Sequence, residues 1–504
     1  MNTSSPALFD FVASLTMAEK RYCRLFLQKH MSKNRYVVLY EYLLKAPKYD
    51  ATEARRHCRC NNKPAAYAVL KKQLAEQLLQ ALHLYDLHTN TEQQLQRSVH
   101  QCQLLLQKGH LDWCEKRLTA VWEQAMSVDL PEVLWQLQQL RLQLMSRRYY
   151  RNITAAGIVE WHRQTEAVLH QMQTTSRYRY LSATVYQMQY EAGARGSELA
   201  ARMREVIRLP EFRSEKNATT LRAQLDYYQV RALYHFTNGE TAKAADFNRR
   251  FLAALDQRLP LKQLLADRYF SVLNNYLIDA FVLKHYAEVE TGLAQLRHLA
   301  KEPAFKRLAN FDVNEFRLGA LLELNYRMAT GQFAAAEKRL PAIEKGLQQF
   351  GQRIVKHNRI TLQYLMAYVA FVQHRYDRAL DYLQPILQEK ESAVAEQVQQ
   401  GARLLQLLTH AEKGDWLLVE SLIKSVRRQW SALPPLVQLV LSFLQRQSKS
   451  GGVSLQHWRL LEKRLLPEAT RPDSSAVLNM FQYVFWVQAH VQQQPMAAVW
   501  PQVH

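Results

Sequence analysis

The residues best suited to metal or thiol chemistry are a histidine and two cysteines close together in the chain, His57, Cys58 and Cys60. Structural zinc sites use two cysteines separated by two residues, with a second pair of ligands farther along. Here one residue separates the cysteines and no second pair follows. We therefore expect no metal site and no cofactor, and we interpret these residues as ordinary side chains near a helix end.

Motifs for nucleophilic or phosphate chemistry are missing from the sequence. It contains no G-x-S-x-G elbow and no glycine-rich loop that could hold a phosphate. Histidines are scattered, and acid pairs such as Glu288 and Glu290 occupy ordinary polar positions of a helix. We predict no catalytic residues and a protein that is not an enzyme.

Two segments interleave arginine with tyrosine. A guanidinium can contact a phosphate while a neighbouring ring stacks on a base, so such segments suit a single-stranded nucleic acid. The same residues could equally be packing tyrosines and solvated arginines on helices. They support an alternative function, a nucleic-acid-binding or regulatory protein with a basic head. The candidate contacts are Arg147, Arg148, Tyr149, Tyr150, Arg151, Arg177, Tyr178, Arg179 and Tyr180.

The composition indicates which elements position these residues. Only 14 glycines and 15 prolines occur in 504 residues, whereas glycine alone averages about 7% of a protein. Helix interiors exclude both residue types. Hydrophobic residues make up 48% of the chain, which is enough for a large core. The sequence therefore predicts an all-α fold.

Charge and cysteine content bear on partners and location. A net charge of +21 attracts acidic proteins or nucleic acid, or it simply solvates many helix surfaces. Five cysteines at irregular spacing favour a reducing compartment. We see no signal-peptide pattern and no apolar stretch of about 18 residues. We expect a cytoplasmic protein without membrane insertion and leave its oligomeric state open.

The middle of the chain repeats a pattern of a small or polar turn, an aromatic residue and a small residue three positions later, with threonine in the aromatic position of the first unit. Residues Thr241, Tyr286, Phe333, Tyr376 and Trp416 open the second helix of each unit, at spacings of 45, 47, 43 and 40. Apolar helices flank every turn. The pattern predicts a row of helix hairpins, with a weaker one at Lys108–Trp113.

These hairpins resemble tetratricopeptide repeats, which carry a turn glycine, an aromatic residue and an alanine at these relative positions. The glycine corresponds to Gly239, Gly331 and Gly414. The small residue corresponds to Ala244, Ala336 and Ala379, with valine at Val289 and Val419. The period exceeds the family's usual value of about 34 residues, and the proline that ends the family's repeat is mostly missing. The resemblance implies a superhelical array, an α-solenoid, in which the first helix of each hairpin lines a concave face.

A concave helical face would bind an extended peptide or a helix of a partner. We therefore expect a non-enzymatic scaffold that binds a protein or peptide, and the net charge favours an acidic partner. Helical phase suggests the residues that face inward from the first helices. They are Tyr228, Arg231, His235, Arg317, Glu323, Arg327, Gln363 and Tyr364.

The N-terminal residues read as a separate helical head. Thr16 and Glu19 have the spacing of a capping box. Asp50 can cap a short helix, and Pro64 can open a long helix that reaches about Leu87. The head is similar to that of uncharacterised bacterial repeat proteins that begin with a Leu-Thr-x-x-Glu-Lys-Arg-Tyr helix.

The chain divides into four predicted segments. A helical head covers 1–90, a degenerate helix-hairpin region 91–220, the repeat array 221–433 and a C-terminal helical cap 434–504. The cap would cover the open end of the array's core. Its last helix, predicted over 478–491, is apolar almost all round.

Overall fold

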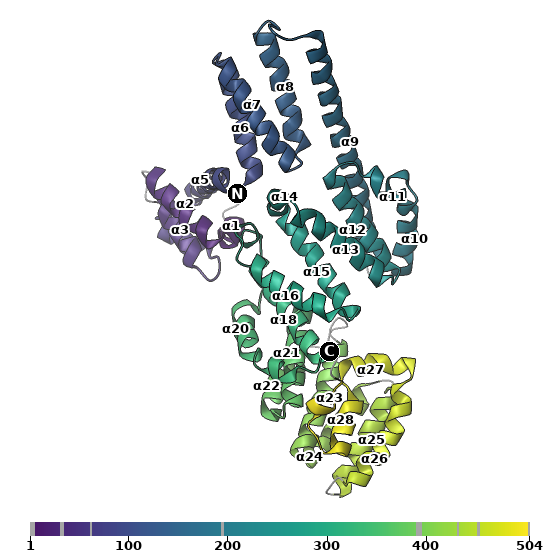
Figure 1. Ribbon diagram of the computed structural model, residues 1–504. Helices are drawn as coiled ribbons and strands as arrows, with labels where there is room; N and C mark the ends of the chain where they lie inside the picture. Colours follow the sequence, from purple (N-terminus) through teal and green to yellow (C-terminus); the bar gives the residue numbers. More distant parts are fainter. Residues whose placement is uncertain are drawn as a thin grey trace. The chain divides into compact units, whose positions relative to one another are not determined.

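The structure is a computed structural model of the chain. It describes residues 6–30, 35–60, 63–192, 196–389, 396–430, 433–450 and 454–501. In these ranges every regular element is a helix, and most helices pack against their neighbours in sequence (Figure 1). The all-α prediction is confirmed. The chain forms two compact units: unit 1 comprises Met1–Asp279 and Glu302–Ala309, and unit 2 comprises Ala280–Lys301 and Asn310–His504.

Unit 1 begins with the head, whose local signals act as predicted. The Thr16 N–H donates to the Glu19 carboxylate at 2.7 Å, and the Glu19 N–H donates to the Thr16 hydroxyl at 3.3 Å. Asp50 accepts from the N–H groups of the first turn of its helix. The helices of the head are α1 (Ala7–Ser14), α2 (Met17–His30), α3 (Arg35–Lys45), α4 (Ala51–His57) and α5 (Pro64–Thr89).

The rest of unit 1 is a series of helices of which α9 is the longest. At 38 residues it extends about 57 Å. The helices are α6 (Thr91–Gln107), α7 (Leu111–Ser127), α8 (Pro131–Arg147), α9 (Ala155–Ala192), α10 (Gly196–Ile207), α11 (Pro210–Arg213), η1 (Glu215–Asn217), α12 (Leu221–Thr237), α13 (Thr241–Asp256), α14 (Leu259–Leu264), α15 (Ala266–Val282) and α17 (Pro303–Lys306). The last residues of α15 belong to unit 2.

Unit 2 continues the pairing of successive helices. Its elements are α16 (Tyr286–Leu299), α18 (Phe311–Ala329), α19 (Phe333–Glu337), α20 (Leu340–Phe350), α21 (Lys356–Val372), α22 (Tyr376–Gln388), α23 (Glu396–Lys413), α24 (Trp416–Gln429), α25 (Pro435–Ser450), α26 (Leu455–Ala469), η2 (Pro472–Ser474), α27 (Ser475–Met480), α28 (Tyr483–Gln492) and α29 (Met496–Val499). One continuous cluster of buried side chains runs from Ala320 to Trp500.

The predicted hairpin turns share one backbone conformation. A residue in the left-handed region ends each first helix, with φ between 56° and 79° at Gly239, Lys284, Gly331, His374 and Gly414. At Gly331 its N–H donates to the Met328 carbonyl, and the next N–H donates to the Arg327 carbonyl. This is the Schellman arrangement, which satisfies carbonyls at a helix end. The weaker hairpin has the same turn at Gly109.

The small residues of the second helices have no exposed surface: Ala244, Val289, Ala336, Ala379 and Val419. In four of the hairpins both helices lie within one unit and pack against each other: α12 with α13, α18 with α19, α21 with α22 and α23 with α24. A larger side chain would force the helix axes apart. The helix-hairpin prediction is therefore confirmed for the four hairpins whose two helices lie in one unit.

Two predicted helices are interrupted. The second helix of the third hairpin breaks between α19 and α20 at Lys338 and Arg339, because Pro341 lacks an N–H and restricts the residue before it. The helix predicted over 478–491 breaks between α27 and α28, where Phe481 has an extended backbone. Contacts with α21 stabilise this second break, as described below.

The head has its own core, formed by buried side chains from Leu8 to Ala81, and a second cluster spans Leu95 to Val168. The predicted division into four segments stays a prediction. Within the described ranges, no helix is both long and apolar enough to cross a bilayer.

Candidate binding groove

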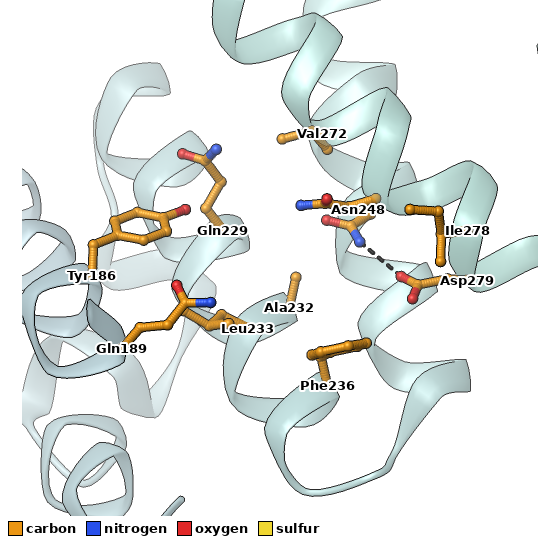
Figure 2. A pocket seen from close by; sticks show the side chains of 11 residues that line it. Tyr186, Gln189, Gln229, Ala232, Leu233, Phe236, Asn248, Val272, Ile278 and Asp279 are labelled. Atoms are coloured by element: carbon orange, nitrogen blue, oxygen red, sulfur yellow. Dashed lines mark hydrogen bonds between the residues drawn. The ribbon is translucent and has the colours of Figure 1, made fainter. Parts of the chain in front are cut away.

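A groove in unit 1 is formed by α9, α12 and α15, with a contribution from α13. Its deepest part is a cavity of about 190 Å³. Figure 2 shows Tyr186 and Gln189 on one side of this cavity and Asn248, Ile278 and Asp279 on the other. The lining residues are Tyr186, Gln189, Gln229, Ala232, Leu233, Phe236, Asn248, Val272, Asn275, Ile278 and Asp279.

A second, more open hollow of about 470 Å³ adjoins the cavity, and Tyr186 and Gln229 line both. We call the cavity and the hollow together the α9–α12–α15 groove. The hollow is more polar than the cavity, and its other lining residues are Arg179, Ser182, Ala183, Asp226, Asp267, Arg268 and Ser271.

Apolar side chains are exposed around the cavity. Phe236 is 58% exposed, and Tyr186 and Ile278 are each 43% exposed. Leu233 and Val272 continue the apolar lining between them. Exposed apolar side chains that gather around a concavity are typical of binding sites, whereas single exposed ones are ordinary. The groove therefore offers apolar area to a ligand.

A buried carboxylate lies in the wall of the cavity. Asp279 is 3% exposed and accepts a hydrogen bond from the Asn248 amide at 2.9 Å. Among the residues that the structure describes, Asn248 is its only hydrogen-bond donor. Burial raises the pKa of Asp279 to about 6, which the hydrogen bond only partly opposes. This carboxylate can still accept a hydrogen bond from a ligand.

The hollow contains a second buried carboxylate with a better partner. Asp226 is 4% exposed and pairs with the Arg268 guanidinium at 2.7 Å. Burial raises the pKa of Asp226, and the positive charge of Arg268 opposes the rise. Arg268 also donates to Gln229. Through these bonds, this cluster holds α12 and α15 together along the floor of the groove.

The residues predicted to face inward from α12 do not line the groove and lie on the neighbouring face of the helix. The Tyr228 hydroxyl donates to Glu215, and the Arg231 guanidinium donates to the Phe212 carbonyl. His235 pairs with Glu240 and stacks on Phe247. The groove uses Gln229, Ala232, Leu233 and Phe236 instead. The prediction differs by one residue, which is about 100° of rotation around a helix.

Two of the residues predicted on α18, Glu323 and Arg327, belong to an internal ion cluster in unit 2. Glu323 is 4% exposed and accepts from Arg327 at 2.9 Å and from Arg339 at 3.1 Å, with Arg297 at 3.8 Å. Arg317 is half-buried, and its burial lowers its pKa. The cluster ties α18 to its neighbours.

The residues predicted on α21 contribute to the core of unit 2. The Tyr364 side chain is 6% exposed, and its hydroxyl donates to the Met480 carbonyl at 2.7 Å. Gln363 is half-buried beside it. Tyr364 does lie on the face that contacts another segment, but that segment belongs to the same unit.

The two arginine–tyrosine segments are far apart. Arg147, Tyr149, Tyr150 and Arg151 are exposed at the turn between α8 and α9, whereas Arg148 is bound by Asp112 and Glu115. The second segment begins 22 residues into α9, about 33 Å along the axis.

The second arginine–tyrosine segment is divided among several contacts. Arg177 pairs with Glu211, and Tyr178 is buried and donates to the Glu211 carbonyl. Arg179 lines the groove, and Tyr180 is 60% exposed. Arg177, Arg179 and Tyr180 are exposed, but Arg177 is paired and Tyr178 is buried, whereas the first segment has four exposed residues at one turn.

The cysteines named for metal chemistry are buried in the head. Burial raises the pKa of the Cys58 thiol to about 12, and the Cys60 thiol donates to the Cys58 carbonyl at 3.4 Å. His57 is exposed and contacts the Glu53 carbonyl. In the described part of the chain, no group of three or more His, Cys, Asp or Glu side chains is placed to hold a metal ion.

Comparison of the chain with protein-family models, with curated proteins and with solved structures finds no match. The function is therefore inferred from the geometry of the chain itself.

The groove residues that the sequence reasoning missed carried a usable signal. Gln229, Leu233 and Phe236 lie ten, six and three residues before the left-handed residue Gly239. Positions three, six and ten residues before the left-handed turn residue lie on the same face of the first helix in every hairpin. The turn residue, which is visible in the sequence, therefore identifies this face.

Proposed function

We propose that this protein is a non-enzymatic scaffold that binds a protein or peptide partner, and that the partner lies in the α9–α12–α15 groove. The observation that carries the proposal is an open concavity with exposed Tyr186, Phe236 and Ile278 above buried polar groups. Apolar rims supply affinity, and a few fixed polar groups supply specificity.

The polar groups of the cavity suit a polypeptide. Gln189, Gln229, Asn248 and Asn275 line it with amides, and each amide has both donors and an acceptor. A peptide backbone offers the complementary N–H and C=O groups. A ligand with only acceptors, such as a phosphate, would bind the amide N–H donors but would leave the amide oxygens without a donor.

We also propose that the hairpins form a tetratricopeptide-like α-solenoid. The left-handed turn residues recur at the sequence spacings of 45, 47, 43 and 40 from Gly239 to Gly414, and the small residues are buried at every hairpin. In such an array the first helices line one face, and α12 and α15 are first helices that line the groove.

An acidic partner fits the net charge of +21, which would increase its association rate. The groove itself contains Arg179 and Arg268 together with Asp226, Asp267 and Asp279. The excess positive charge must therefore act from outside the groove, as a long-range field.

A photo-crosslinking amino acid at position 236 tests the proposal in cells. We expect a discrete crosslinked polypeptide from this position and none from position 259 on α14, where Leu259 is equally exposed, at 55%, outside the groove. Equal crosslinking from both positions would count against the groove.

The exposed Arg147, Tyr149, Tyr150 and Arg151 favour a second candidate function, binding of a single-stranded nucleic acid. Tyr149 is 84% exposed and is held by a left-handed turn. Replacing Arg147 and Arg151 with alanine should reduce the slope of log affinity against log salt by about 0.7 for each lost phosphate contact. An unchanged slope would exclude this turn.

A further inference from the structure

In unit 2, the face of α21 is covered by the C-terminal segment of the same unit. The break between α27 and α28 lies against two tyrosines: the Tyr364 hydroxyl donates to the Met480 carbonyl at 2.7 Å, and the Gln482 N–H donates to the Tyr368 hydroxyl at 3.0 Å. The backbone groups freed by the break are thus satisfied by side chains of a first helix. Phe481 inserts at this point and is 1% exposed.

The covering segment also places a tryptophan against a carboxylate. The indole N–H of Trp486 donates to Glu412 of α23 at 2.7 Å, and His490 contacts the same oxygen at 2.7 Å. Trp486 is 2% exposed. The next first helix after α21, which is α23, therefore supplies the acceptor for an aromatic donor of the covering segment.

The groove of unit 1 uses the same helical register. Tyr364, Tyr368 and Phe371 lie ten, six and three residues before the left-handed residue His374. The groove residues Gln229, Leu233 and Phe236 occupy these three positions before Gly239. Both sets belong to first helices, and in both cases the following first helix adds a carboxylate: the largely covered Glu412 of α23 and the buried Asp279 of α15.

The two faces differ in whether they are covered. Phe371 is 3% exposed because Phe481 packs on it with ring centroids 5.5 Å apart, whereas Phe236 is 58% exposed. Glu412 accepts from three side chains, but Asp279 accepts only from Asn248 among the described residues. The α9–α12–α15 groove therefore presents on α12 the same helix positions that the C-terminal segment covers on α21, but in the groove no described segment covers them.

We propose, building on the proposed function, that the groove binds a partner polypeptide through a tryptophan side chain. Its ring packs between Leu233, Phe236 and Ile278, and its indole N–H donates to Asp279. In unit 2 two side chains of the covering segment make these contacts separately: Phe481 packs on Phe371, and the Trp486 indole N–H donates to Glu412. A tryptophan in the groove would combine both contacts in one side chain.

The chemistry of the cavity favours tryptophan over other residues. About 190 Å³ is the room of roughly six water molecules, which suits one aromatic side chain. Indole has a large apolar body and a single donor. Phenylalanine would leave Asp279 without a second donor, and an acidic side chain would place like charges together. A lysine would lose its hydration against apolar walls.

The test presents a library of random peptides, displayed on phage and long enough to cross the groove, to the immobilised full-length protein. Peptides are then measured against Phe236→Ser, Asp279→Asn and the control Leu259→Ser, an exposed apolar residue outside the groove. We expect enriched peptides to contain tryptophan. Their affinity should fall about 30-fold with Phe236→Ser and about tenfold with Asp279→Asn, while the control leaves it unchanged.

Other outcomes separate this inference from the proposed function. Peptides that depend on Phe236 but lack tryptophan would overturn the inference and leave the groove as a peptide site. Peptides that bind equally well to all variants, or no enriched peptides, would overturn both proposals. Self-association of the chain that is lost in Phe236→Ser would identify a second copy as the occupant and overturn the partner proposed here. Circular dichroism of each variant establishes that it is folded.

Discussion

The first helices α12 and α21 present the same three positions to different surroundings. On α21 the positions hold Tyr364, Tyr368 and Phe371, all less than 7% exposed beneath the C-terminal segment. On α12 they hold Gln229, Leu233 and Phe236, which line an open groove. One face completes a core and the other remains available, although both follow from the same hairpin geometry.

The carboxylates next to these faces differ in the same sense. Burial alone would raise the pKa of Glu412, but hydrogen bonds and charge from His490, with further bonds from Trp486 and Tyr376, lower it below its ordinary value. Burial raises the pKa of Asp279 to about 6, and Asn248 opposes the rise only weakly. A buried carboxylate with one donor destabilises the folded chain and is typical of a functional site. Glu412 is therefore satisfied within unit 2, whereas Asp279 has one donor among the described residues and is the group that we propose binds a ligand.

Alanine at the two matched phenylalanines, Phe371 and Phe236, should give the largest difference in stability between the two regions. Phe371→Ala removes a buried ring and should lower the free energy of unfolding by about 3–5 kcal/mol. Phe236→Ala removes an exposed ring and should change it by about 0.5 kcal/mol or less. Urea unfolding followed by tryptophan fluorescence measures both. Similar losses at the two positions would mean that the groove is covered in solution.

Glu412→Gln should destabilise unit 2 by about 2–3 kcal/mol, because an amide cannot accept from all three donors at once. The control Glu420→Gln, in an exposed pair with Lys424, should cost about 0.5 kcal/mol or less. The folded pKa of Glu412 is lowered, so its contribution is present above the ordinary pKa of about 4.3 and is lost as pH falls through the folded value. Unfolding should be measured at pH 7 and at decreasing pH, and the difference between wild type and variant should disappear only once the pH falls below the lowered folded pKa.

Asp279→Asn should change the free energy of unfolding in the opposite direction to Glu412→Gln, and by a smaller amount. The amide keeps an acceptor for Asn248 and removes a buried charge, so the variant should be more stable at pH 7 by about 1–2 kcal/mol. The folded pKa of Asp279 is raised, so its destabilising effect grows as pH rises from about 4 through 6. In parallel unfolding experiments, the stability of the wild type relative to the variant should therefore increase as pH is lowered from 7 to 5. A less stable variant at pH 7 would indicate that Asp279 is a structural residue like Glu412.

The turns should show the smallest contrast between the two regions. Gly239 and Gly414 have φ of 75° and 79°, and no atom lies within 4 Å of a β-carbon built at either. Alanine should therefore cost about 1–2 kcal/mol at each, from the left-handed backbone alone. Thermal unfolding of the two variants measures this. Unequal losses would mean that the two hairpins are not equivalent, which would weaken the comparison of their faces.

Much of the fold was predictable because its signals are local. The Thr16–Glu19 capping box, the Asp50 cap and the turn glycines Gly239, Gly331 and Gly414 act through neighbouring backbone groups. The small residues of the second helices were recognisable from spacing, because close packing of a hairpin requires them. The position of the groove was less accessible: the predicted Tyr228, Arg231 and His235 each lie one position before a residue that lines it.

The sequence by itself determined the helices, their turns and the pairing of each helix with the next, since these depend on residues close together in the chain. Tertiary structure alone decided what each face meets. Contacts between residues more than 100 positions apart, Tyr364 with Met480 and Tyr368 with Gln482, stabilise the interruption between α27 and α28. The apolar periodicity over 478–491 predicted an unbroken helix there, because periodicity carries no information on what a distant side chain can donate or accept. The same reason left the open cavity and the buried Asp279 invisible until helices α9, α12 and α15 were placed together.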